Sequence, residues 1–160
     1  MKKRILSLLI LLSAATATMA YNSILAKLVK TDYEGKADSL TKVFIKEFMN
    51  TSKGTFWVTP KGVNSSNTYI YWQQAHAIDV VIYAYQRNLA AGNKTQANLY
   101  KNYVSKWFQN KGNNYSGGST GFENPYTDDM CWIALTLQRM GEVFNNNTYF
   151  STAKKLFDNG

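Results

Sequence analysis

The adjacent carboxylates Asp128 and Asp129 are the pattern in this sequence best suited to chemistry. They follow Pro125 and begin a long apolar run, which places them at the start of a predicted helix. Neighbouring residues diverge by about 100° around a helix, since a turn takes roughly 3.6 residues. Their carboxyl groups can still lie roughly 5 Å apart, the spacing of retaining glycoside hydrolysis, which needs one ionised carboxylate and one protonated carboxyl group. Acidic residues are also common in the first turn of helices as caps and dipole partners, so spacing alone leaves both interpretations open.

A second group of residues, from Trp72 to Asp79, combines an indole, amides, an imidazole and a carboxylate. Gln73, His76 and Asp79 are spaced three apart and can share one face of a helix. An indole stacks on the apolar face of a sugar ring while polar side chains bond the ring hydroxyls, so this segment suits a sugar site. The alternative is a core helix with one satisfied polar cluster. A metal site is not expected, because the chain has 1 His and 1 Cys.

Two further features give weaker signals. The Gly-rich segment 115–122 lacks the Lys of a phosphate-binding loop and follows no strand, so we interpret it as a mobile loop at the rim of a cleft, or as an inert linker. Cys131 lies inside the apolar run and is expected to be a small core residue rather than a nucleophile.

Helices must position these residues, because apolar side chains recur three and four positions apart in five segments. The predicted helices cover residues 37–49, 71–91, 95–110, 127–144 and 148–157. A loop, in which a short extended piece is an open alternative, is expected between residues 54 and 68, and no strand pattern is found. The predicted fold class is all-α, with antiparallel helix pairs formed across the short breaks at 92–93 and 145–147.

The first twenty residues have the order of a secretory signal peptide: basic residues at 2–4, an apolar stretch from Ile5 to Ala17, and small residues at the exit. That stretch is too short for a comfortable membrane span, and none is expected in the mature chain. The protein is therefore expected to be exported, to a periplasm, the cell surface or the medium. Loss of three basic residues lowers the formal net charge from +8 to +5. Lys and Arg are scattered along the rest of the sequence, which does not predict a nucleic-acid partner.

Two motifs, read together, resemble glycoside hydrolase family 76, which comprises the α-1,6-mannanases and related fungal cell-wall transglycosidases. The motifs are Glu123-Asn124-Pro125-Tyr126-Thr127-Asp128-Asp129-Met130-Cys131-Trp132 and Tyr71-Trp72-Gln73-Gln74-Ala75-His76-Ala77-Ile78-Asp79. The acidic pair within this context is far more specific than two acidic residues alone. The resemblance covers roughly residues 36–159.

The resemblance implies an (α/α)6 barrel whose helix pairs ring a cleft, and retaining, endo-α-1,6-mannanase-like cleavage of mannan or α-mannose oligosaccharides. By position, Asp128 matches the nucleophile and Asp129 the general acid/base. The resemblance implies no metal or organic cofactor. It also implies substrate-binding roles for five cleft residues: Trp72, Gln74, His76, Asp79 and Trp132.

A twelve-helix barrel needs more than twice the length of the mature chain. We therefore expect residues 21–160 to be the N-terminal portion of such a catalytic domain, poorly folded and inactive by themselves. The alternative function is a non-catalytic exported helical protein that binds glycan or partners, such as a helical-repeat module, although no second copy of a 34-residue repeat is found. The sequence leaves open endo or exo action, and hydrolysis or transfer.

Overall fold

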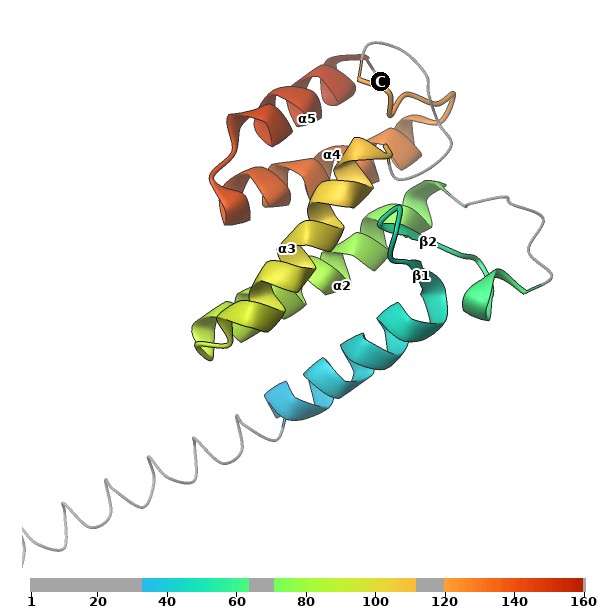
Figure 1. Cartoon of the computed structure of the whole chain (residues 1–160). Coiled ribbons are helices and arrows are strands. Elements are labelled where there is room, and N and C mark those ends of the chain that lie inside the picture. Colours follow the sequence, from blue (N-terminus) through green and yellow to red (C-terminus); the bar gives the residue numbers. More distant parts are fainter. Residues whose placement is uncertain (1–32, 64–70, 112–119, 160) are drawn as a thin grey trace, which may run out of the picture. The chain divides into compact units, whose positions relative to one another are not determined.

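The computed structural model describes residues 33–63, 71–111 and 120–159 (Figure 1). The chain divides into two units, residues 1–39 and 40–160. The predicted signal peptide, and most of the Gly-rich segment 115–122, lie outside the described residues.

Helices make up most of the described chain. A helix covers residues 33–48, and four more follow: α2 (Tyr71–Ala90), α3 (Lys94–Gln109), α4 (Thr127–Phe144) and α5 (Asn147–Asn159). The prediction of a mostly helical fold is confirmed.

A small β-hairpin lies where the sequence indicated the end of a helix and a loop with a short extended piece. Strands β1 (Met49–Asn50) and β2 (Thr55–Phe56) pair antiparallel, and a short 3-10 helix, η1 (Pro60–Gly62), follows them. The Asn50 side chain accepts hydrogen bonds from the Ser52 backbone and hydroxyl, which closes the turn. Strands of two residues are too short to show alternation, so the sequence pattern missed them.

Helices α2 to α5 form two hairpins, α2–α3 and α4–α5 (Figure 1). Gly92 in the first connection and Asn145 in the second have positive φ, at 78° and 48°. This left-handed conformation ends a helix and favours Gly or Asn. The Asn146 N–H donates to the carbonyl of Gly141 at 3.1 Å and so caps the end of α4.

The first helices of the two hairpins, α2 and α4, run parallel and pack on each other. His76 meets Trp132, and Tyr83 meets Arg139, and the partners in each pair are 56 positions apart. The two helices also begin 56 positions apart, at Tyr71 and Thr127. The N-terminal ends of α2 and α4 therefore lie side by side, and the carboxylates predicted to react start one of them.

One apolar core joins these elements. Its largest fully buried side chains include Trp107 and Tyr100 of α3, Ile78 of α2 and Leu137 of α4. Burying a side chain of this size contributes roughly 1.5–3 kcal/mol. Across residues 33–63, 71–111 and 120–159, no helix has the length and apolarity needed to cross a membrane.

Candidate active site at the start of helix α4

The acidic pair occupies the first turn of α4, as predicted from the sequence. Asp128 is exposed and Asp129 is half-buried. The residue before the helix, Tyr126, makes no side-chain cap, so the first N–H groups of α4 lack that partner. Negative charge in this turn is favoured by the helix dipole. The pair therefore stabilises the start of α4 whatever else it does.

Asn124 fixes the orientation of one of the two carboxylates. Its amide Nδ2 donates to Oδ2 of Asp129 at 2.9 Å, and its Oδ1 accepts the backbone N–H of Tyr126 at 3.0 Å. The second bond closes a local turn that holds the Asn124 side chain in place. The carboxylate of Asp129 is therefore oriented by the Asn124 amide, which the Tyr126 N–H holds in place in turn. Active sites pre-organise a reacting side chain in this way.

The loop that carries Asn124 is anchored on both sides. Phe122 is fully buried near Trp107, and its carbonyl accepts a hydrogen bond from the Tyr71 hydroxyl at the start of α2. Glu123 accepts hydrogen bonds from the Thr120 hydroxyl, at 2.5 Å, and from the Thr120 backbone N–H. Desolvation by itself raises the pKa of Glu123, but these bonds, with those from its own backbone N–H and from Asn159, outweigh it and lower the pKa to about 2.

Three rings form a platform across the starts of α2 and α4. The His76 ring lies 4.7 Å from Trp132 and 5.5 Å from Trp72, measured between ring centroids. Trp72 is 40% exposed and Trp132 is 44% exposed. Because Trp132 lies one turn after Asp128 on the same helix, the platform and the carboxylates occupy neighbouring surface. Exposed indoles beside carboxylates are typical of sugar-binding surfaces, where the ring stacks and the polar groups bond hydroxyls.

Asp79 lies further along α2 and is paired with a cation. It forms an ion pair with Arg139 of α4, and Arg139 also lies over the ring of Tyr83 at 5.3 Å. The hydrogen bond with Asp79 raises the pKa of Arg139. Asp79 therefore helps to join α2 to α4 and stands apart from the ring platform.

Gln74 does not join this surface either, because its side chain is buried. Its Nε2 donates to the carbonyl of Phe56 at 2.7 Å, and its Oε1 accepts the N–H of Phe56 at 3.0 Å. Both polar atoms of the Gln74 amide are thus used to fasten β2 to α2. The structure brings together Asp128, Asp129, Trp72, His76 and Trp132, and places Gln74 in the core.

Cys131 is half-buried and lines a surface groove, so the prediction of a core position for it is wrong. Within the part of the chain that the structure describes, no three His, Cys, Asp or Glu side chains are grouped closely enough to hold a metal ion.

Sequence reasoning missed three residues that shape this site: Asn124, Glu123 and Arg139. Pro125 predicts a turn at Asn124, but it does not predict that the Asn124 amide bonds the carboxylate of Asp129. Glu123 is bonded locally by Thr120, but its other partner, Asn159, is 36 positions away, and Asp79 is 60 positions from Arg139. No local pattern encodes these two distant contacts.

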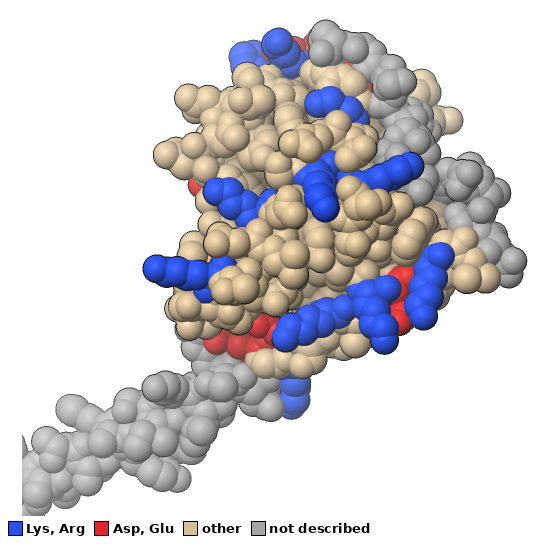
Figure 2. Space-filling model, in the orientation of Figure 1, with Lys and Arg blue, Asp and Glu red and all other residues tan. Residues whose placement is uncertain are grey.

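Basic side chains are spread over the face shown in Figure 2, and the row along its lower edge is interrupted by acidic ones. Among the described residues, Lys46 and Lys61 both lie within 4.0 Å of Glu47. The absence of a nucleic-acid partner stays a prediction.

Comparisons with family models, with curated proteins and with solved structures give no match for this chain.

Proposed function

We propose that this protein is a retaining glycoside hydrolase that cleaves α-1,6-mannosidic linkages, with Asp128 and Asp129 as its reacting carboxyl groups. The observation that carries the proposal is the position of this pair. It lies at the start of α4, with Asp129 oriented by Asn124 and two exposed indoles on the neighbouring surface. The choice of α-1,6-linked mannose rests on the resemblance of the two motifs to glycoside hydrolase family 76.

In the proposed reaction, Asp128 attacks the anomeric carbon of a mannosyl residue while Asp129 protonates the departing glycosidic oxygen. A covalent mannosyl ester on Asp128 results. Asp129, now ionised, takes a proton from water as that water attacks the ester, which releases a new reducing end in the original α-configuration and restores both groups. Attack by a sugar hydroxyl in place of water gives transfer instead of hydrolysis.

The ring platform supports this proposal by offering a place for the substrate. Trp72 and Trp132 both contact the His76 ring, and both indoles are partly exposed to solvent. A pyranose ring buries its apolar face on such an indole, and stacking of this kind fixes the sugar relative to the carboxylates. We assign Trp72, His76 and Trp132 to substrate binding, and we assign Asp79 to the junction of α2 and α4 that supports the platform.

The finer description of the fold, part of an (α/α)6 barrel, belongs to the same proposal. It is supported by two successive helix hairpins whose first helices are parallel and in contact. In such a barrel the first helices of the hairpins line the cleft, which agrees with a site at the starts of α2 and α4.

The stereochemistry of the product tests the proposal. The full-length product of the open reading frame is incubated with linear α-1,6-mannan, and the anomeric protons of the new reducing ends are followed by NMR before mutarotation. We expect the α-anomer to be formed first. Initial release of the β-anomer would contradict a covalent intermediate on Asp128.

The second candidate is a glycan-binding protein without catalytic activity, and the exposed indoles favour it independently of the carboxylates. It predicts that α-1,6-mannose oligosaccharides quench the Trp fluorescence, that Trp132→Ala abolishes this quenching, and that no reducing ends are released. Quenching together with turnover would favour the hydrolase.

A further inference from the structure

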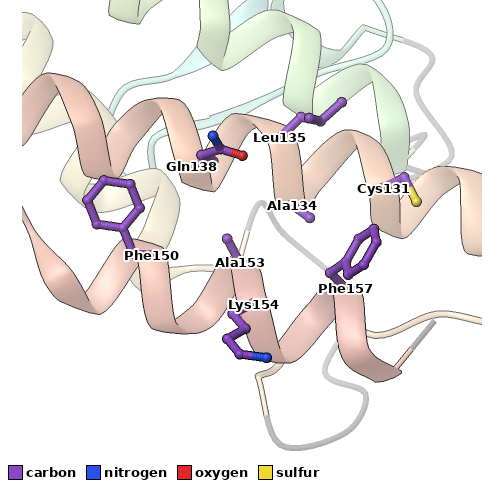
Figure 3. A pocket seen from close by; sticks show the side chains of 8 residues that line it. All are labelled: Cys131, Ala134, Leu135, Gln138, Phe150, Ala153, Lys154 and Phe157. Carbon is purple, nitrogen blue, oxygen red and sulfur yellow. The ribbon is translucent and has the colours of Figure 1, made fainter.

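The groove between α4 and α5 has the apolar surface of a binding site but lacks free polar groups (Figure 3). Its volume is about 530 Å³, and most of its lining is apolar. Its amide and its ammonium group are already paired, because Gln138 donates to Glu142 at 3.1 Å and Lys154 donates to Asp158 at 2.6 Å. Neither group is free to orient a ligand.

A smaller pocket, lined by residues of the helix 33–48, of β2 and of α2, has a different composition. Its volume is about 180 Å³, below the roughly 300–1,000 Å³ of sites for drug-sized ligands, so it accepts a single ring-sized unit. Aromatic side chains form much of the lining, and none of the lining side chains is charged. The lining residues are Phe44, Phe48, Phe56, Trp57, Val58, Gln73, Gln74 and Ala77.

The walls of this pocket are held in place by the surrounding structure. Gln74 exchanges two hydrogen bonds with the backbone of Phe56, at 2.7 and 3.0 Å, and the Phe44 ring stacks on the Phe56 ring with centroids 5.2 Å apart. The Trp57 indole lies so close to Gly62 that a Cβ on this glycine would be 3.1 Å from the ring. The pocket is therefore pre-formed, which lowers the entropic cost of binding.

Two polar groups of the pocket are available to a ligand. Trp57 is half-buried and Gln73 is exposed. Neither the Trp57 indole N–H nor the Gln73 side-chain amide has a hydrogen-bond partner among the described residues. An indole face with a free N–H and a free amide, in a lining without charge, suits a neutral sugar ring, whose C–H groups stack while its hydroxyls accept and donate hydrogen bonds.

Helix α2 places this pocket next to the ring platform. Gln73 and Ala77 directly follow Trp72 and His76 in the sequence, so their rows lie about 100° apart around the helix. Neighbouring Cα atoms are about 3.8 Å apart. A glycan chain that lies on the platform is therefore close enough to extend toward the pocket.

We propose that the pocket beside β2 binds one neutral hexopyranose unit of a longer α-1,6-mannose chain, with Trp57 stacking on the sugar and Gln73 bonding its hydroxyls. The choice of mannose rests on the proposed function. Gln74, for which the resemblance implied substrate binding, then acts indirectly by holding the wall of this pocket.

The length of the glycan tests the proposal, because only a chain longer than the platform reaches the pocket. Binding of α-1,6-mannobiose and α-1,6-mannotetraose is measured by isothermal titration calorimetry. The protein is the full-length gene product carrying Asp128→Asn, so that the sugars are not consumed. We expect the tetraose to bind about tenfold more tightly than the biose.

Adding Trp57→Ala should abolish this advantage of the tetraose and leave the affinity for the biose unchanged, which also shows that the variant is folded. Trp57→Phe keeps an aromatic face and should retain most of the advantage. Gln73→Ala should weaken binding of the tetraose alone. Gln86→Ala, at an exposed position further along α2, is the matched control and should change neither affinity.

A tetraose that binds no more tightly than the biose, or that keeps its full advantage in Trp57→Ala, would overturn the proposal. Loss of the advantage in Trp57→Ala, together with a wild-type protein that releases no reducing ends, would support the pocket and contradict the proposed hydrolysis. The two proposals can therefore fail separately.

Discussion

At the level of single residues, Asn124 distinguishes a prepared carboxylate from an ordinary helix start. Two asparagines of this chain close the same kind of turn before a helix. Oδ1 of Asn124 accepts the N–H of Tyr126 at 3.0 Å, and Oδ1 of Asn146 accepts the N–H of Thr148 at 2.9 Å. Only Asn124 of the two also donates to a carboxylate, that of Asp129. The comparison of these two residues therefore separates the catalytic role from the role in the turn.

We expect Asn124→Ala to lower kcat on α-1,6-mannan by up to about 100-fold, because Asp129 loses the group that orients it. KM should change little, since the ring platform is intact. The matched control, Asn146→Ala, removes an equivalent turn bond before α5 and should leave kcat unchanged. Equal losses of kcat in both variants would show that the effect of Asn124 is only structural.

Glu123 makes stability dependent on pH at the acid end. Its pKa is lowered from 4.5 to about 2 in the folded chain, so the folded state binds the proton more weakly than the unfolded state. The stabilisation from Glu123 is complete above about pH 5 and is lost as the pH falls from 4.5 toward 2. We expect Glu123→Gln to be less stable than the wild type at pH 7 and to approach it at pH 3, measured by urea unfolding.

Glu142→Gln, at an exposed position on α4, is the control for this comparison. A constant difference between wild type and Glu123→Gln from pH 7 to pH 3 would contradict the role given to the Glu123 carboxylate.

At the level of elements, the α4–α5 hairpin depends on a close approach at Gly141. A Cβ built on this residue would lie 2.7 Å from the Phe150 ring, closer than such atoms approach each other. Gly141→Ala should therefore force the ring of Phe150 aside and destabilise the chain by about 1–3 kcal/mol. Gly35 lies in a helix with nothing within 4 Å of its Cβ position, so Gly35→Ala should be neutral or slightly stabilising. Thermal unfolding of both variants measures the difference, and a neutral Gly141→Ala would show that the hairpin is loosely packed.

The helices and the position of the acidic pair could be predicted from the sequence because their signals are local. Apolar spacing predicted α2, α3, α4 and α5 to within one or two residues at most ends. The hairpin, the buried contact of Gln74 with Phe56 and the pairing of Asp79 with Arg139 could not be predicted in this way. Each depends on residues that are distant in the sequence and are brought together only by packing.

The correspondence between the two helix hairpins could not be predicted from the sequence either. The α2–α3 and α4–α5 hairpins correspond in space, yet their sequences share no evident motif, because a helix surface accepts many combinations of apolar side chains. The offset of 56 positions was visible only once His76 and Tyr83 had been placed against Trp132 and Arg139.

At the level of the whole molecule, the parallel packing of α2 on α4 places the exposed indoles near two carboxylates, which is the arrangement that the proposed glycan site requires. The starts of both helices meet at this surface, and the anchored loop with Asn124 adjoins it.

The measurement that tests the central claim most directly is the release of reducing ends from linear α-1,6-mannan by the full-length gene product and its Asp128→Asn variant. Removing the nucleophile should lower kcat by at least about 1,000-fold. Asp158→Asn, which changes an exposed carboxylate paired with Lys154 on α5, is the matched control and should retain full activity. Wild-type turnover in Asp128→Asn would contradict the role assigned to this residue and, with it, the proposed reaction.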